Sequence, residues 1–280
     1  PVIHRDYRAL IESDGVDVVH IATTHPHHRD IALAAISAGK AVLVEKAFTV
    51  TLAGTEEVVA AATEAGVFAM EAMWTRFLPA VEAAREVVAW GRIGQVLGVQ
   101  GDLCAFRPYD PTNRLWDPAT GGGAVLDLGV YVVSMAQGLL GAARDVHCVG
   151  RYAPNGVESA ATMNISYIGG GTAALTCGFD VHGPGRMTIF GTKGWVEIQP
   201  RFHHPTTISV HRSGVLPRII EAKQIGRGYA HELMEVSDCL LAGQTQSATM
   251  PLADTVEVMR VLESCLKQLG RPQEEAKVEI

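Results

Sequence analysis

Hydrophobic and polar residues alternate with two different periods in the first part of the chain. Three short runs, 16–22, 41–45 and 67–73, are almost continuously apolar and rich in β-branched side chains, which is typical of strands buried on both faces. Segments 29–40 and 51–66 repeat their apolar residues at helical spacing, and glycines lie at their ends. This alternation of strands and helices predicts a parallel sheet covered by helices.

The pattern changes after Trp74, where longer strands and turn residues dominate. The elements predicted there are, in chain order, a helix over 78–91, an alternating strand over 95–106, an apolar helix over 124–141, strands between 145 and about 223, and helices over 229–242 and 251–270. Turn residues at regular spacing favour antiparallel pairing of those strands. We therefore predict an α/β fold in two domains: a parallel sheet in 1–73, and in 74–280 an α+β domain with a large, mostly antiparallel open sheet.

Composition and charge narrow the class of protein. The chain is 48% hydrophobic and 19% charged, and its 23 basic and 30 acidic residues give a net charge of −7, so nothing indicates a nucleic-acid partner. Five dispersed cysteines without a CxxC pair are typical of a reducing cytoplasm. No uninterrupted apolar run reaches the roughly 20 residues of a membrane span. We expect a cytoplasmic protein without a membrane partner.

Candidate chemistry lies at the ends of the predicted parallel strands, because ligands bind beyond the carboxyl ends of such strands. The three ends are residues 23–28, 45–46 and 71–76. Glu45 and Lys46 follow the second strand with no loop between them. A surface ion pair of little energetic value is the simpler interpretation, and a functional pair is the alternative.

A second candidate is the apolar helix over 124–141. Asp127 and Tyr131 are four residues apart, so they share one helix face. A buried tyrosine satisfied by an aspartate explains the pair without any chemistry. If a lysine from a strand end joined them, its charge would lower the phenol pKa from about 10 towards the range of acid–base catalysis.

Two histidine groups, 25–28 and 203–204, raise the question of a metal. Neither group has a carboxylate or a cysteine at ligand spacing. We therefore expect no metal site, and we expect His27 and His28 to cap a helix or to line a pocket.

Six motifs together resemble the Gfo/Idh/MocA family of oxidoreductases. They occur in the family's order across almost the whole chain, as VDVVHIATTHPHH, GKAVLVEKAFT, FAMEAMWTRFLPA, GRIGQVLGVQGD, GGGAVLDLGVY and FGTKGWVEI. The MWTRFLPA segment and the Asp-x-x-x-Tyr spacing are most similar to the branch of dihydrodiol dehydrogenases and NADP-dependent D-xylose dehydrogenases. The resemblance implies that 1–73 is the remainder of a Rossmann dinucleotide-binding domain and that 74–280 binds substrate and mediates oligomerisation.

The resemblance also implies roles for individual residues. Lys46 matches the family lysine between nicotinamide and substrate, Tyr131 matches its proton-transfer residue, and Asp127 matches the acidic partner of that residue. The positions that match a cofactor site are Ala22, Thr23, Pro26, His28, Glu45, Lys46, Trp74 and Arg76. NADP is favoured over NAD by the branch resemblance alone, and the expected substrate is a secondary alcohol of a sugar, a polyol or a cyclic diol.

Two departures from the family pattern affect these expectations. Ala47 replaces the proline of the family's Glu-Lys-Pro signature, so we expect a trans peptide between Lys46 and Ala47, because a cis bond without proline costs about 2.5–4 kcal/mol. The GxGxxG unit that binds pyrophosphate in relatives is not found in this sequence, so we expect an N-terminally incomplete chain with weak cofactor binding.

The alternative to a dehydrogenase is a non-catalytic paralogue that binds a ligand or serves as a structural subunit. The missing phosphate-binding unit and Ala47 favour it, whereas the joint presence of Lys46, Asp127 and Tyr131 favours the enzyme. In relatives the open sheet mediates subunit contacts, so the resemblance implies a homodimer or homotetramer.

Overall fold

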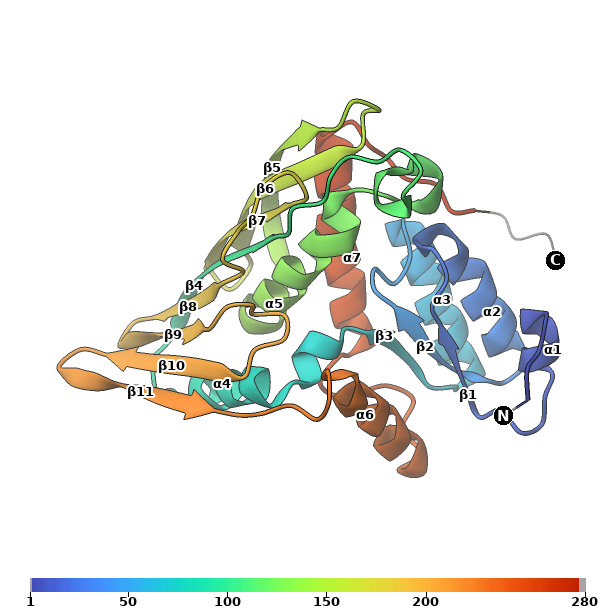
Figure 1. Cartoon of the computed structure of the whole chain (residues 1–280). Coiled ribbons are helices and arrows are strands. Elements are labelled where there is room, and N and C mark those ends of the chain that lie inside the picture. Colours follow the sequence, from blue (N-terminus) through green and yellow to red (C-terminus); the bar gives the residue numbers. More distant parts are fainter. Residues whose placement is uncertain (1, 277–280) are drawn as a thin grey trace.

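The first sheet lies at one end of the molecule and is fully parallel (Figure 1). The structure, a computed structural model, describes residues 2–276. Strands β1 (Val18–Ile21), β2 (Ala41–Glu45) and β3 (Ala69–Ala72) pair in the order β1-β2-β3. All of β3 and all of β2 except Glu45 are buried, which confirms the expectation of strands covered on both faces.

Three helices accompany this sheet: α1 (Tyr7–Ile11), α2 (His28–Ser37) and α3 (Leu52–Ala65). The sequence explains both ends of α3. The Thr51 hydroxyl accepts the backbone N–H of Gly54 at 3.0 Å, and Gly66 ends the helix with a φ of 65°, which glycine adopts without strain. The pattern of apolar residues did not predict α1.

The second sheet has eight strands in the order β11-β10-β9-β8-β4-β7-β6-β5. Every neighbouring pair is antiparallel except β4 with β7, so the predicted mixed, mostly antiparallel open sheet is confirmed. The strands are β4 (Val96–Cys104), β5 (Ala143–Tyr152), β6 (Glu158–Tyr167), β7 (Thr172–Gly178), β8 (Met187–Gly191), β9 (Gly194–Ile198), β10 (Thr207–Arg212) and β11 (Val215–Glu221).

The other helical elements of residues 2–276 are four α-helices and five short helical turns. They are α4 (Pro79–Ala89), α5 (Val130–Leu140), α6 (Tyr229–Leu241) and α7 (Leu252–Gln268), with short 3-10 turns η1 (His25–His27), η2 (Trp74–Phe77), η3 (Arg114–Trp116) and η4 (Pro118–Thr120) and the π-helical turn η5 (Val125–Gly129). Helices α5 and α7 contact the large sheet, and α7 also contacts α3 and β3 (Figure 1). Helix α7 thereby links the two sheets.

The segment Pro118–Leu140 is apolar and long enough to cross a membrane, but 72% of its most apolar window is buried inside the protein. It is the central helix of the core. The predicted helix over 124–141 is divided in the structure, because its first part forms the π-helical turn η5 and only its second part is the α-helix α5. The site depends on this turn.

Candidate active site

Lys46 leaves the end of β2 and enters a tightly held loop. The carbonyl oxygen of Lys46 lies 3.2 Å from His25 Nε2, and that of Ala47 lies 3.0 Å from His28 Nδ1. The Glu71 carboxylate accepts the backbone N–H of Phe48 at 3.2 Å. The Lys46–Ala47 peptide is cis, so the expectation of a trans bond was wrong. That expectation considered only the local cost of the peptide bond and omitted the buried partners that hold both carbonyl oxygens.

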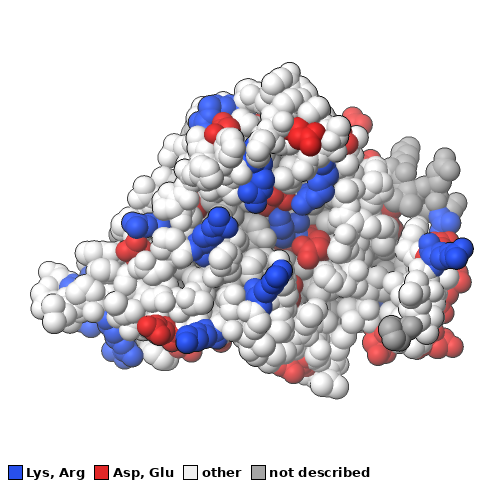
Figure 2. Space-filling model, viewed as in Figure 1, with Lys and Arg blue, Asp and Glu red and all other residues white. Residues whose placement is uncertain are grey.

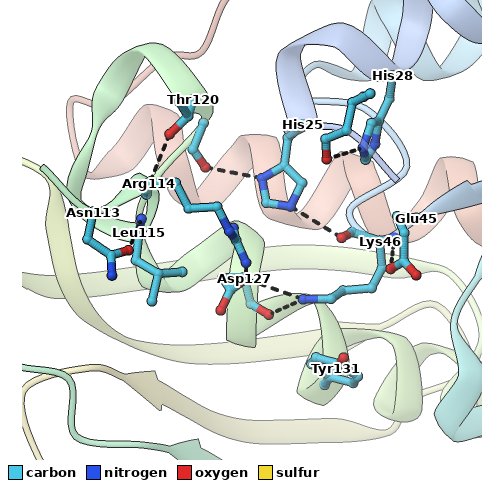
Figure 3. Close-up of polar contacts among 12 residues, drawn as sticks. His25, His28, Glu45, Lys46, Asn113, Arg114, Leu115, Thr120, Asp127 and Tyr131 are labelled. Carbon is cyan, nitrogen blue, oxygen red and sulfur yellow. Dashed lines mark hydrogen bonds and ion pairs between the residues drawn. The ribbon is translucent and has the colours of Figure 1, made fainter. Parts of the chain in front are cut away.

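The Lys46 ammonium reaches across to the second domain (Figure 3). Its Nζ donates to the backbone carbonyl of Asp127 at 2.8 Å and lies 3.4 Å from Asp127 Oδ1. Arg114 Nη2 approaches the same carboxylate oxygen at 3.5 Å from the other side. Asp127 lies in the π-helical turn η5, and both its carbonyl group and its side chain contact the lysine. Figure 2 shows basic and acidic side chains together in the hollow between the two domains.

Tyr131 lies under the same ammonium. Lys46 Nζ is 4.8 Å from the centre of the Tyr131 ring, and the Trp74 indole N–H donates to the phenol oxygen at 3.0 Å. The side chain is 7% exposed. The structure therefore brings Lys46, Asp127 and Tyr131 together, as the resemblance implies, and adds Trp74 as a direct partner of the phenol.

Burial and charge set the protonation of these three groups. Burial alone would lower the pKa of Lys46, but Tyr131, Asp127 and Glu45 together raise it. Burial opposes the ionisation of Asp127, but Lys46 and Arg114 outweigh it and lower the pKa of that carboxyl. The site thus holds a charged lysine and a charged aspartate at neutral pH.

The phenol behaves differently from the expectation. Burial raises the pKa of Tyr131 above its ordinary value, and Lys46 and the Trp74 N–H only partly offset this. The expectation of a lowered pKa was therefore wrong for the structure as it stands. The ammonium lies over the ring rather than at the hydroxyl, and Asp127 already neutralises part of its charge. Tyr131 is a protonated phenol at neutral pH.

The histidines after β1 hydrogen-bond to the loop that carries Lys46. Burial, the Lys46 ammonium and His28 lower the pKa of His25 to about 4, and burial also lowers the pKa of His28. His25 bridges the carbonyl groups of Lys46 and Gly121, which belong to different domains. The Thr24 hydroxyl and His27 Nδ1 are hydrogen-bonded at 2.8 Å, but His27 makes no side-chain capping bond at the start of α2, so the expectation that it caps a helix was wrong. Among residues 2–276, no group of three His, Cys, Asp or Glu side chains is arranged to hold a metal ion.

The other residues predicted to bind cofactor form three groups: those after β1, Glu45 after β2, and Arg76 after β3. Ala22 and Thr23 are exposed just beyond the end of β1, where a ligand of a parallel sheet binds, whereas Pro26 and His28 are buried. Glu45 lies beside the loop and pairs with His20 at 3.4 Å.

Arg76 forms the third group. Its guanidinium donates to Ser134 and Gln137 at 2.7–2.9 Å and to Asp254 at 2.5 Å, and none of these belongs to the Lys46 cluster. The structure therefore gives Arg76 a packing role between α5 and α7 and does not bring it to the site.

An aromatic group beside Trp74 was missed by sequence reasoning. Tyr229, at the start of α6, packs against Trp74 with ring centres 4.6 Å apart. His203, in the loop between β9 and β10, lies 5.6 Å from the Tyr131 ring and 4.4 Å from His204. Burial, with His204 next, lowers the pKa of His203 to about 3, so its imidazole is neutral. The sequence signal for His203 is its adjacency to His204, which by itself indicates no contact with a tyrosine.

Lys46, at the end of a strand of the parallel sheet, thus meets the carboxylate and the phenol of the second domain at the edge where ligands of parallel sheets bind. Residues 3–73 match an oxidoreductase family with an NAD-binding Rossmann fold, and residues 81–197 match the C-terminal domain of the GFO/IDH/MocA proteins. The chain is 34% identical to trans-1,2-dihydrobenzene-1,2-diol dehydrogenase of Mus musculus, covering 96% of this chain and 82% of that protein. The Homo sapiens enzyme of that name is 32% identical with the same coverage. The chain belongs to the Gfo/Idh/MocA family of oxidoreductases, and the resemblance read from its motifs is confirmed.

Solved structures agree on the fold. The aldose-aldose oxidoreductase of Caulobacter crescentus, complexed with glycerol, is 28% identical with a TM-score of 0.84, covering 94% of this chain and 80% of that one. A levoglucosan dehydrogenase in complex with NADH and levoglucosan has a TM-score of 0.86 at 22% identity, covering 95% and 81%. The second comparison supports the architecture alone.

Proposed function

We propose that this protein is a nicotinamide-dependent dehydrogenase that acts on a secondary alcohol of a sugar, a polyol or a cyclic diol. The observation that carries the proposal is the Lys46 ammonium held between Asp127 and the Tyr131 ring at the end of a parallel strand. Relatives named for a dihydrodiol and a solved relative named for aldoses support this substrate class.

The residues at the strand ends fit a nicotinamide cofactor. Exposed Ala22 and Thr23 follow β1, Glu45 and Lys46 follow β2, and the Trp74 indole lies beside the phenol. These positions would hold the nicotinamide end, and NADP is preferred to NAD on the branch resemblance. When bound, the cofactor supplies the hydride acceptor for alcohol oxidation, or the donor for the reverse reaction.

Tyr131 transfers the proton in this proposal. Its phenol is protonated at neutral pH, so it can donate that proton to the oxygen of a bound carbonyl compound. Alcohol oxidation requires the phenolate instead, and the Lys46 ammonium stabilises the phenolate through its charge. Asp127 holds the ammonium in place. The rate of alcohol oxidation is therefore expected to rise with pH above neutrality, while carbonyl reduction is favoured at neutral pH.

The test combines turnover with cofactor binding. Tyr131→Phe and Lys46→Met should each lower kcat about 10²- to 10⁴-fold in an NADP-linked alcohol assay. Lys193→Met, at an exposed turn between β8 and β9, is the matched control and should behave as wild type. Quenching or enhancement of NADPH fluorescence reports binding independently of turnover. Activity within threefold of wild type in Tyr131→Phe would remove the phenol from the mechanism. A lack of cofactor binding even at NADPH concentrations high enough to detect the weak binding expected of this chain would favour the ligand-binding alternative.

We also propose that the open face of the large sheet joins two or more copies of this chain. Phe190 is 41% exposed and Trp195 is 42% exposed on neighbouring strands β8 and β9, and Trp195 stacks on His211 with ring centres 4.6 Å apart. Helices cover only the other face of this sheet in the described part of the chain.

A further inference from the structure

A buried glutamate lies beneath the helical turn that carries Asp127. Glu158 is the first residue of β6 and is 0% exposed. Its Oε1 accepts the backbone N–H of Val125 at 3.4 Å, and its Oε2 lies 3.6 Å from Arg271 Nε. Burial raises the pKa of this carboxyl to about 7. A carboxyl group that is fully buried calls for a structural or functional reason.

Gly123 shows how closely the carboxyl group fits the turn. A Cβ at position 123 would overlap the Glu158 carboxylate, and Gly123 has a φ of 130°, which side-chain-bearing residues rarely adopt. The carbonyl of Gly123 accepts the backbone N–H of Asp127 at 3.3 Å. Glu158 therefore touches the turn at Gly123 and at Val125, immediately before Asp127.

The position of that turn determines whether Asp127 can reach the lysine. Lys46 Nζ bonds to the backbone carbonyl of Asp127 as well as approaching its side chain, so rotation of the side chain alone could not compensate for a displaced backbone. Val125 lies only two residues before Asp127. A shift of about 1 Å in the turn would break the 2.8 Å contact between Lys46 and the carbonyl oxygen.

We propose that Glu158 is a positioning residue that fixes the Gly123–Val125 turn and thereby holds Asp127 against Lys46. This inference deepens the proposed function, and its predicted effect on turnover rests on that function. The contact between Asp127 and Lys46 that it predicts can be tested without any substrate. Glu158 touches neither the lysine nor the phenol, so it acts through Asp127.

The experiment follows the reactivity of Lys46 towards acetic anhydride, measured by mass spectrometry of peptides. A protonated amine does not react, so a fall of one unit in the pKa of Lys46 makes its acetylation about tenfold faster. Glu158→Ala should accelerate the acetylation of Lys46 about 3- to 10-fold at pH 8, because Asp127 no longer holds the ammonium. Glu158→Gln keeps an acceptor for Val125 and should remain within twofold of wild type. Acetylation of the exposed Lys193 should be the same in all variants.

A second variant keeps the test decisive if Glu158→Ala does not fold. Glu158→Asp retains the charge but withdraws the carboxylate from Val125 by one methylene, and it should also accelerate the acetylation of Lys46. In an NADP-linked alcohol assay, both variants should lower kcat about 10-fold with KM changed less than threefold, whereas Glu158→Gln restores kcat. Unchanged Lys46 reactivity in the folded variants would overturn the inference. A response of Lys46 in a protein whose wild type lacks dehydrogenase activity would support the positioning role and reject the proposed function.

Discussion

The pH dependence of stability should depend strongly on one buried carboxyl group, that of Glu232. It lies in the first turns of α6, three residues after Tyr229, which packs against Trp74 at the site. The side chain is 2% exposed, and no partner for its Oε2 is found among residues 2–276. Burial, with a smaller contribution from Glu45, raises the pKa of Glu232 to about 8.

The magnitude follows from linkage. The carboxyl group titrates near 4.5 when the chain is unfolded and at about 8 when it is folded. Between these values the folded chain binds more protons than the unfolded chain, so the free energy of unfolding falls as pH rises. At 1.36 kcal/mol for each pH unit, the ionisation of Glu232 lowers the free energy of unfolding by at most about 5 kcal/mol at pH 9. Glu232→Gln removes this ionisation and keeps the shape of the side chain.

Urea unfolding at pH 5, 6, 7, 8 and 9 measures the effect. The difference in unfolding free energy between Glu232→Gln and wild type should increase steadily in favour of the variant from pH 5 to pH 8. Buried Glu71 and Glu158, whose pKa values also lie at about 7, contribute equally to both proteins and cancel in this difference. Glu64→Gln, an exposed position in α3, is the control and should show no trend. A difference that stays constant within about 0.5 kcal/mol would refute the reasoning.

Two further predictions concern the phenol and the open sheet. Trp74→Phe removes the N–H that donates to the Tyr131 oxygen at 3.0 Å. The pH at which alcohol oxidation reaches half its maximum should therefore rise, and kcat at pH 7 should fall about 5- to 10-fold. An unchanged pH profile would contradict this role of Trp74. Trp195→Glu places a charge on the open face and should shift sedimentation velocity towards a smaller species. Trp90→Glu makes the same change at an exposed residue that ends α4, and it should not shift sedimentation. Equal sedimentation of Trp195→Glu and wild type would exclude that face from the interface.

The arrangement of strands and helices could be predicted largely from the sequence. Strand β2 reads as a continuous apolar run because helices cover both faces of the small sheet, and that pattern distinguishes parallel from antiparallel pairing. The spacing of residues could not show that Asp127 and Tyr131 meet Lys46, because the three groups are brought together by the packing of two domains. The motif resemblance supplied that link.

Local conformation at the site was the part least accessible from sequence. The cis peptide at Lys46–Ala47 and the π-helical turn Val125–Gly129 both occur where buried groups from distant segments hold the backbone, Glu71 in one case and Glu158 in the other. Local preferences favour a trans peptide and an α-helix at these positions. Tertiary contacts outweigh them, and such contacts have no signature in a short stretch of sequence.

A strand-end position alone does not identify a catalytic residue, as Lys46 and Arg76 show. Both follow strands of the same parallel sheet, and both were predicted to lie at the site. The Arg76 guanidinium is fully engaged by Ser134, Gln137, Thr249 and Asp254, so it has no capacity left for a ligand. The Lys46 ammonium has three N–H groups, and the two acceptors found for it among residues 2–276 both belong to Asp127. Nζ also lies 4.8 Å from the centre of the Tyr131 ring, and in the proposed mechanism its third N–H is the one left for a substrate hydroxyl. Unused hydrogen-bonding capacity, rather than position at the strand end, distinguishes the catalytic candidate from the packing residue.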